Sequence, residues 1–165
     1  MKYICSLIVV DDVKKSRYLY ETILGCKVIS DFGENVAFEG SFAIHQKDHF
    51  MKLISNNPVL KKSNSSELYF EDDEIEKTEK IIEDNNFEFI HKIVEQPWKQ
   101  RVLRFYDYDF NIIEIGEPLE HVAYRLYMEN INIEEISKIT YLTVDKINES
   151  IKYYKEKKVP TTAST

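Results

Sequence analysis

A small set of side chains in this sequence could do chemistry at a concave site. Glu114 lies between Ile113 and Ile115, so strand alternation turns its carboxylate to the opposite face from both isoleucines. If that face lines a binding site, the carboxylate needs a counterpart such as a cationic ligand group, an arginine or a metal ion. The alternative is a structural ion pair with Arg101 or Arg104.

Three further side chains could contact a ligand. His45 alternates with Ala43 in an extended run, and its role is either a ligand contact or a structural hydrogen bond. Trp98, in the loop EQPWKQR, either stacks on a planar or cationic ligand or anchors the loop. Arg101 either pairs with an anionic substrate group or with Glu95. With Glu114, these residues form the predicted ligand-binding set.

These residues belong to a pattern of elements that occurs twice along the chain. In the first copy, an apolar run at residues 3–10 predicts a strand buried on both faces, after which Asp11 or Asp12 caps a helix that ends at Gly25. Three extended runs separated by turn residues follow, at 26–32, 35–40 and 41–46. The first copy is therefore a strand, a helix and three strands.

The second copy repeats this order. Its helix begins at Asp72 or Asp73, so that Asp73 takes the place that Asp12 has in the first copy. One βαβββ unit leaves a sheet face exposed, and two units side by side can close it. The pattern predicts an α+β fold in which two βαβββ repeats, at 3–46 and 66–116, form a cupped, half-barrel mixed sheet.

A polar connector links the repeats. Residues 47–65 are interrupted by Pro58 and predict a connector with one short helix at its start. Repeats and connector together make one predicted domain, residues 1–117.

The chain after Pro118 has a different pattern. Its apolar residues take helical spacing, with Asn132 and Thr143 as caps, which predicts a helical appendage of two or three helices over residues 118–158. Residues 159–165 have no partner to pack against and are predicted to form a frayed tail.

Composition limits the classes of partner. The chain has 22 Lys and Arg against 29 Asp and Glu, so a net charge of −7 gives no reason to expect nucleic acid or an anionic membrane as partner. The apolar run near the N-terminus is too short for a signal peptide or a membrane span. Cys5 and Cys26 lack CxxC spacing and are typical of reduced thiols. We therefore expect a cytoplasmic protein.

Both copies resemble the vicinal oxygen chelate superfamily, the group of glyoxalases, bleomycin resistance proteins and extradiol dioxygenases. The resemblance is carried by LIVVDDVKKSRYLYETILGCKV and by QPWKQRVLRFYDYDFNIIEIGEP, the latter being close to the family's PWG-R-x-x-x-DPDGNxIE ending. It covers residues 2–117 and leaves the helical appendage unexplained. The resemblance implies a homodimer whose cups bind small molecules.

Metal-dependent members of that superfamily draw their ligands from the first and last strands of each repeat. The resemblance assigns these positions to Cys5, His45, Ser66 and Glu114. A divalent ion used as a Lewis acid needs three or more hard or imidazole ligands, and only His45 and Glu114 are of this kind. We therefore expect no resident cofactor, with a divalent metal as the alternative.

Residues 132–151 have the rhythm of a helix-turn-helix motif, but their composition does not suit DNA. The second helix would offer Asp145, Lys146, Asn148 and Glu149 and no arginine, and Tyr141 takes the turn place where glycine is usual. An interaction or dimer-capping role is the favoured prediction for the appendage.

Three functions follow from these observations. The main prediction is a glyoxalase-like or bleomycin-resistance-like protein that binds a small planar or amphipathic molecule in the sheet cup without a functional metal. The first alternative is a metal-dependent lyase, isomerase or dioxygenase in which Glu114 has a catalytic role. The second is a ligand-sensing regulator that acts through the C-terminal helices.

Overall fold

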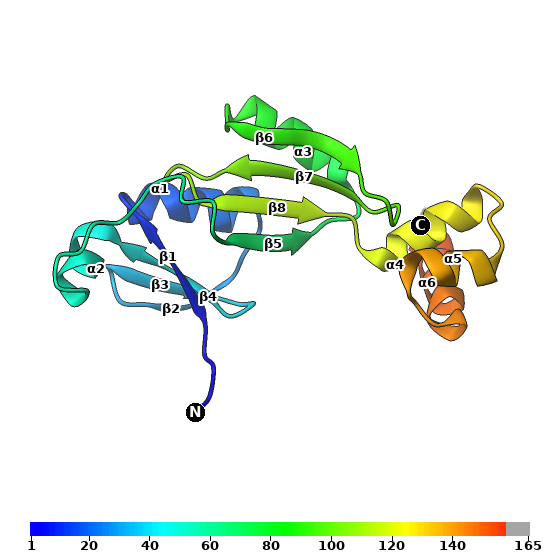
Figure 1. Ribbon diagram of the computed structural model, residues 1–165, viewed down its shortest axis with the longest axis horizontal. Helices are drawn as coiled ribbons and strands as arrows, with labels where there is room; N and C mark the ends of the chain where they lie inside the picture. Colours follow the sequence, from blue (N-terminus) through cyan, green and yellow to red (C-terminus); the bar gives the residue numbers. More distant parts are fainter. Residues whose placement is uncertain (158–165) are drawn as a thin grey trace, which may run out of the picture. The chain divides into compact units, whose positions relative to one another are not determined.

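The first repeat forms a four-stranded sheet in the computed structural model, which describes residues 1–157 (Figure 1). The strand order is β1-β4-β3-β2, and β1 pairs with β4 in parallel while the other pairs are antiparallel. Its strands are β1 (Ser6–Val10), β2 (Val28–Asp31), β3 (Asn35–Phe38) and β4 (Phe42–Gln46).

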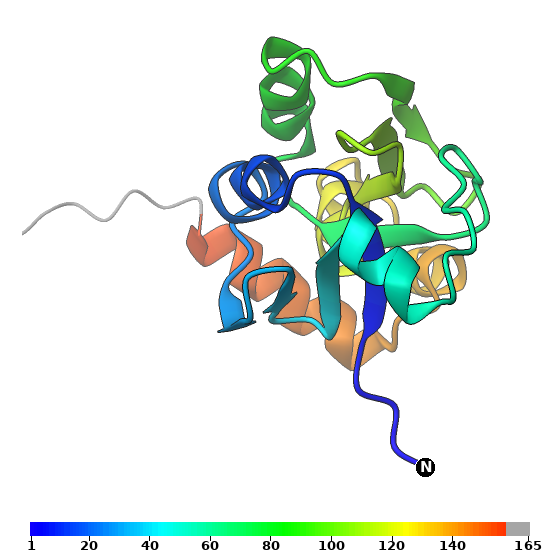
Figure 2. The same ribbon diagram turned by 90° about the vertical axis from the view of Figure 1, so that its left-hand side faces the viewer.

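Strand β1 is shorter and more exposed than the sequence predicts. It begins at Ser6, and Tyr3 and Ile4 are 71% and 67% exposed. The preceding residues run as an extended segment (Figures 1 and 2). The prediction of a strand from residue 3 buried on both faces is wrong, because the pairing with β4 begins at Ser6 and the side chains of Ser6 and Leu7 are exposed.

The helix of the first repeat begins at the predicted cap. Asp12 accepts a hydrogen bond from the backbone N–H of Lys15 (3.1 Å) and starts α1 (Val13–Arg17), which continues as a π-helical segment, η1 (Tyr18–Ile23). Gly25, at φ +70°, then ends it in the left-handed conformation that glycine adopts at least cost.

The second repeat has the same order of strands, β5-β8-β7-β6. These are β5 (Glu67–Glu71), β6 (Phe89–Glu95), β7 (Arg101–Tyr106) and β8 (Ile112–Gly116). The shared order confirms the repeat of two βαβββ patterns and the α+β class.

The helix of this repeat, α3 (Ile75–Asp84), starts later than predicted. Asp72 accepts a hydrogen bond from the backbone N–H of Glu74 (2.9 Å) in the turn before the helix, whereas Asp73 pairs with Lys157 (2.6 Å). The prediction that Asp73 matches Asp12 as a helix cap is therefore wrong, because the carboxylate of Asp73 is drawn to a lysine of the last helix.

The connector and the appendage contain the predicted helices. The connector begins with α2 (Lys47–Leu53). The appendage has α4 (Leu119–Met128), α5 (Ile133–Thr140) and α6 (Val144–Lys157), with Asn132 and Thr143 accepting cap hydrogen bonds as expected. These helices pack around an apolar core of their own, made of Val122, Ala123, Leu126, Ile136, Ile147 and Ile151.

The described chain divides into two compact units. The first contains Met1–Leu68, Ile81–Ile90 and Arg104–Ile113, and the second contains Tyr69–Lys80, His91–Leu103 and the described residues from 114 to 157. The closure of the sheets into a half-barrel cup and the domain boundary at residue 117 stay predictions. The predicted tail, 159–165, lies outside the described residues. In residues 1–157 we find no helix with the length and apolarity needed to cross a bilayer.

Candidate functional site

Glu114 is a buried carboxylate on strand β8, with 7% of its surface exposed. Gly116 lies two residues further along the strand and therefore on the same face. A Cβ atom at Gly116 would come within 2.8 Å of Tyr69 Cε2, so the ring of Tyr69 covers this face where glycine leaves room for it. Glu114 and Tyr69 thus belong to one face of the second sheet.

The hydroxyl of Tyr69 is fixed from two sides. It donates a hydrogen bond to Glu71 Oε1 (3.0 Å) and accepts one from Gln100 Nε2 (3.0 Å). Burial, the hydrogen bond to Glu71 and its charge, and the charge of Glu114 raise the pKa of Tyr69 to about 12. The phenol is therefore neutral near pH 7, and we call Glu114, Tyr69, Glu71 and Gln100 the Glu114 face.

Trp98 is joined to the Glu114 face through Gln100. Its indole N–H donates to Gln100 Oε1 (2.9 Å), while the amide nitrogen of Gln100 donates to Tyr69 and to the backbone carbonyl of Glu117 (2.8 Å). Gln100 is buried, and these contacts engage both its amide oxygen and its amide nitrogen, so the orientation of the amide is fixed. The Trp98 ring itself is 45% exposed, and its flat surface is available to a planar molecule.

Arg101 lies on the opposite face from Gln100, because consecutive residues of an extended chain alternate. Its guanidinium donates to both carboxylate oxygens of Glu117 (3.0 Å each) and pairs with Glu76 of α3. The partner that sequence analysis offered, Glu95, instead pairs with Lys99 and Arg125. Arg101 is thus engaged in a protein ion-pair network.

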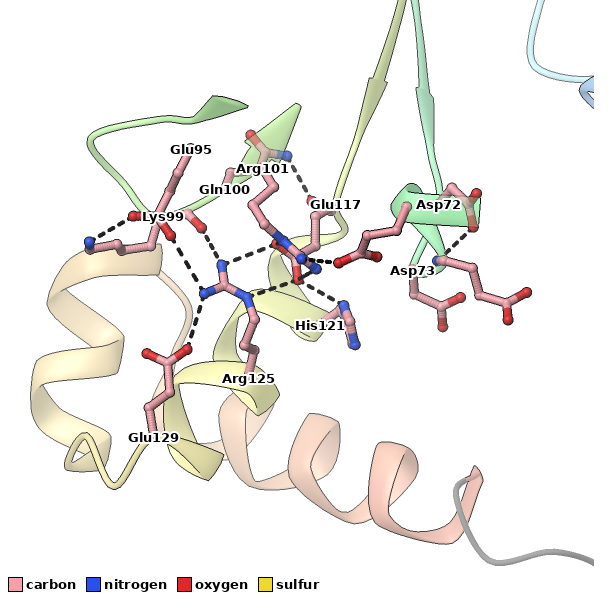
Figure 3. A network of polar contacts seen from close by, with 12 residues as sticks. Asp72, Asp73, Glu95, Lys99, Gln100, Arg101, Glu117, His121, Arg125 and Glu129 are labelled. Carbon is pink, nitrogen blue, oxygen red and sulfur yellow. Dashed lines mark hydrogen bonds and ion pairs between the residues drawn. The ribbon is translucent and has the colours of Figure 1, made fainter. Parts of the chain in front are cut away.

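That network centres on Glu117, whose side chain is fully buried (Figure 3). Arg125 of α4 donates to both oxygens of Glu117 (3.2 Å each), and His121 Nδ1 lies 2.8 Å from Oε1. Burial alone would raise the pKa of Glu117, but the adjacent His121 and the hydrogen bonds from Arg101 and Arg125 outweigh it and hold the pKa well below its usual range. The network fastens α4 to the start of strand β7.

His45 lies buried on strand β4 in the first unit, with a second histidine beside it. Its Nδ1 is 3.2 Å from Asn35 Nδ2, and its Nε2 is 2.8 Å from His49 Nδ1. Because the amide nitrogen only donates, Nδ1 of His45 accepts and Nε2 donates to His49. Burial and the neighbouring His49 lower the pKa of His45, which favours the neutral form of the ring.

The paired repeats, the strand order and the ending around Glu114 can now be compared with known proteins. Residues 3–120 match the family described as a glyoxalase-like domain. This chain belongs to the glyoxalase-like domain family. The match confirms the resemblance drawn from the sequence, and it ends at the start of α4.

Solved structures resemble the glyoxalase-like part of the chain. A protein of unknown function from Agrobacterium tumefaciens is 34% identical, with a TM-score of 0.63 over 71% of this chain and 94% of that one. A glyoxalase/bleomycin resistance protein/dioxygenase from Nocardioides is 18% identical (TM-score 0.56, 71% and 83% covered). A fosfomycin resistance protein from Listeria monocytogenes is 16% identical (TM-score 0.55, 74% and 98% covered). The last two share the fold. No curated protein matches the chain.

The resemblance drawn from the sequence implies metal-ligand positions at Cys5, His45, Ser66 and Glu114, so the fit of this chain to a metal can be tested on these donors. Both ring nitrogens of His45 are occupied by Asn35 and His49, and Ser66 offers only a hydroxyl, which binds such ions weakly. Within residues 1–157, no three His, Cys, Asp or Glu side chains gather as a metal site would require. These residues do not fit a resident divalent ion.

Sequence analysis missed three residues that the structure places beside the predicted ones. Tyr69 and Gln100 were not predicted, because their proximity to Glu114 depends on how neighbouring strands pair. Alternation in β5 does place Tyr69 on one face with Glu71. His49 escaped although it follows His45 by four residues, a spacing that brings side chains together where a strand runs into a helix. Alternation within each strand was the signal available for the first two.

Proposed function

We propose that this glyoxalase-like protein binds a small planar or amphipathic molecule on the Glu114 face, without a resident metal. The observation that carries the proposal is the buried carboxylate of Glu114 beside a neutral phenol and an amide whose orientations are fixed. A carboxylate removed from water attracts a hydrogen-bond donor or a cationic group more strongly than one in solvent.

Each neighbour supplies a different kind of contact. The exposed ring of Trp98 offers an apolar surface for a planar group, and Gln100 holds it in place through the indole N–H. Apolar surface combined with a few converging polar groups is the usual composition of a small-molecule site. In this proposal Arg101 acts on the opposite face and supports the sheet, and His45 stays a predicted ligand contact of the first unit.

Binding is preferred to metal-assisted catalysis because of the donor set. Of the ligand positions that the superfamily uses, Cys5 and Ser66 replace the usual hard ligands, and His45 is already hydrogen-bonded through both nitrogens. Glu114 therefore acts as a recognition group for the ligand in this proposal.

A thermal-shift screen of metabolites and drugs tests the proposal with three proteins. The wild type is compared with Glu114→Gln and with a control, Glu76→Gln. The control removes the same charge on the opposite side of the sheet, where Glu76 pairs with Arg101. A ligand of the Glu114 face should bind Glu114→Gln more weakly by about 1 to 3 kcal/mol. Its affinity for Glu76→Gln should be unchanged. Hits with equal affinity for all three proteins would refute the site.

A further inference from the structure

A cavity of about 510 Å³ lies in the second unit, apart from Glu114. It is formed by the loop between β6 and β7, the start of α4 and the end of α5, all of them visible in Figure 1. Its volume is within the range of small-molecule sites. The lining is mainly apolar and includes Pro97, Trp98, Leu119, Lys138, Ile139 and Tyr141.

Two large aromatic side chains line this cavity and remain exposed to solvent. Trp98 is 45% exposed and Tyr141 is 89% exposed. The indole N–H of Trp98 is already used by Gln100, so what Trp98 offers to the cavity is its ring. Aromatic side chains that stay exposed contribute no hydrophobic stabilisation to the fold. Where several of them lie together, they mark a binding site.

Tyr141 has a backbone conformation that is unfavourable for a tyrosine. Tyr141 follows α5 with φ 59° and ψ 12°, the left-handed conformation that glycine or asparagine adopts more readily at a helix end. The residue gains no burial in exchange, because most of its surface faces solvent. The backbone N–H of Tyr141 caps α5 by donating to Ser137 (2.9 Å), but a large side chain that stays exposed at a strained position is more readily explained by a role outside folding.

Lys138 supplies the charge of this cavity. It is exposed on α5, one turn before Tyr141. Over residues 1–157, its ammonium group makes no ion pair. A cation beside two aromatic rings disfavours a cationic ligand and favours a flat molecule with a negative group.

We propose that this cavity is a second binding site, which takes a planar aromatic molecule carrying a carboxylate or a sulfonate. The rings of Trp98 and Tyr141 contact the flat body of the ligand, and Lys138 pairs with its anionic group. The helices after residue 118 then have a binding function, since they supply Leu119, Lys138 and Tyr141. This site shares the ring of Trp98 with the proposed Glu114 face, but Glu114 itself does not line it.

The sequence contains a single tryptophan, which makes the site directly observable. The probe is 8-anilinonaphthalene-1-sulfonate, an aromatic sulfonate with a flat naphthalene ring system that accepts excitation energy from tryptophan. If it binds in the cavity, Trp98 emission falls and sensitised probe emission rises in a saturable manner. The uncharged analogue N-phenyl-1-naphthylamine should bind the wild type about 2- to 5-fold more weakly, as expected for loss of one exposed ion pair.

Two variants and two controls locate the probe. Tyr141→Gly should weaken binding about tenfold through loss of ring contact, and because glycine favours the left-handed conformation it should keep or raise the melting temperature. Lys138→Met should weaken binding of the sulfonate about 2- to 5-fold and leave the neutral analogue unaffected. Lys152→Met, which removes a lysine of α6 outside the cavity, should bind as the wild type does. Glu114→Gln should also leave this binding unchanged, which separates this site from the Glu114 face.

Two results would overturn the proposal. One is energy transfer that is equal in the wild type, Tyr141→Gly and Lys138→Met, since the probe would then lie elsewhere. The other is a change of molecular mass in Tyr141→Gly, measured by light scattering, with probe binding intact. That outcome would assign the aromatic surface to an interface between copies of the chain.

Discussion

Gln100 and Arg101 are consecutive residues whose side chains serve opposite faces of the second sheet. Gln100 Nε2 donates to the hydroxyl of Tyr69, whereas Arg101 pairs with Glu117 and with Glu76 of α3. One step along the chain, at the start of β7, thus separates the groups beside Glu114 from the ion-pair network that fastens α4. Changes at Glu117 should therefore act on stability, and changes near Tyr69 on the Glu114 face.

Glu117→Gln should lower the free energy of unfolding by about 3 kcal/mol, because it leaves two arginines beside a buried group that no longer carries a charge. Urea denaturation at neutral pH measures this loss. Glu129→Gln is the matched control, since Glu129 pairs with the same Arg125 at a more exposed position, and it should cost at most about 0.5 kcal/mol. Equal losses in the two variants would contradict the central place of Glu117.

The same carboxylate predicts a pH dependence. The pKa of Glu117 is lower in the folded protein than the ordinary value of 4.5 that applies to the unfolded chain, so its ion pairs stabilise the fold fully above that value. Their contribution is lost progressively as the pH falls below about 4.5. Stability measured between neutral pH and acid should therefore decline more steeply in the wild type than in Glu117→Gln. Parallel curves would show that other groups govern acid unfolding.

His45 predicts a second pH dependence, nearer to neutrality. Its pKa is lowered in the folded protein by burial and by His49, so the unfolded chain binds the proton more readily. Stability should therefore fall as the pH falls through the ordinary histidine value of 6.5, by at most about 1.4 kcal/mol per pH unit. His45→Gln should flatten this part of the curve. An unchanged slope in that variant would refute the assignment.

Gly116→Ala tests the packing of the Glu114 face. The new Cβ atom would come within 2.8 Å of Tyr69 Cε2 and 2.9 Å of its hydroxyl, so the ring must move and its hydrogen bond from Gln100 must lengthen. We expect a loss of about 1 kcal/mol in the free energy of unfolding. In a double-mutant cycle, Tyr69→Ala should remove most of this loss, since the clash disappears with the ring. Additive effects would show that Gly116 is needed for another reason.

Chelation should leave the protein folded. Because the donors around His45 do not fit a divalent ion, elemental analysis of the purified protein should find less than about one such ion for every two chains, and a chelator should not change the melting temperature. Stoichiometric zinc, nickel or iron bound through Glu114 would overturn this prediction and favour the enzyme alternative.

The sequence by itself determined the repeated order of elements, the helix starts at Asp12, Asn132 and Thr143, and the family. These features depend on local chemistry, since a cap is set by residues within one turn and a strand or helix by the spacing of its apolar residues. Glu114 was found in the same way, because alternation between two isoleucines is visible in the sequence.

The tertiary structure decided which side chains meet. Asp73 resembles Asp12 in sequence, yet it pairs with Lys157, more than eighty residues away along the chain. The partners of Arg101, Gln100 and Trp98 likewise depend on strand register and on where α3 and the appendage pack. Such contacts join residues distant in sequence, and their energies depend on burial and geometry that arise only when the chain has folded.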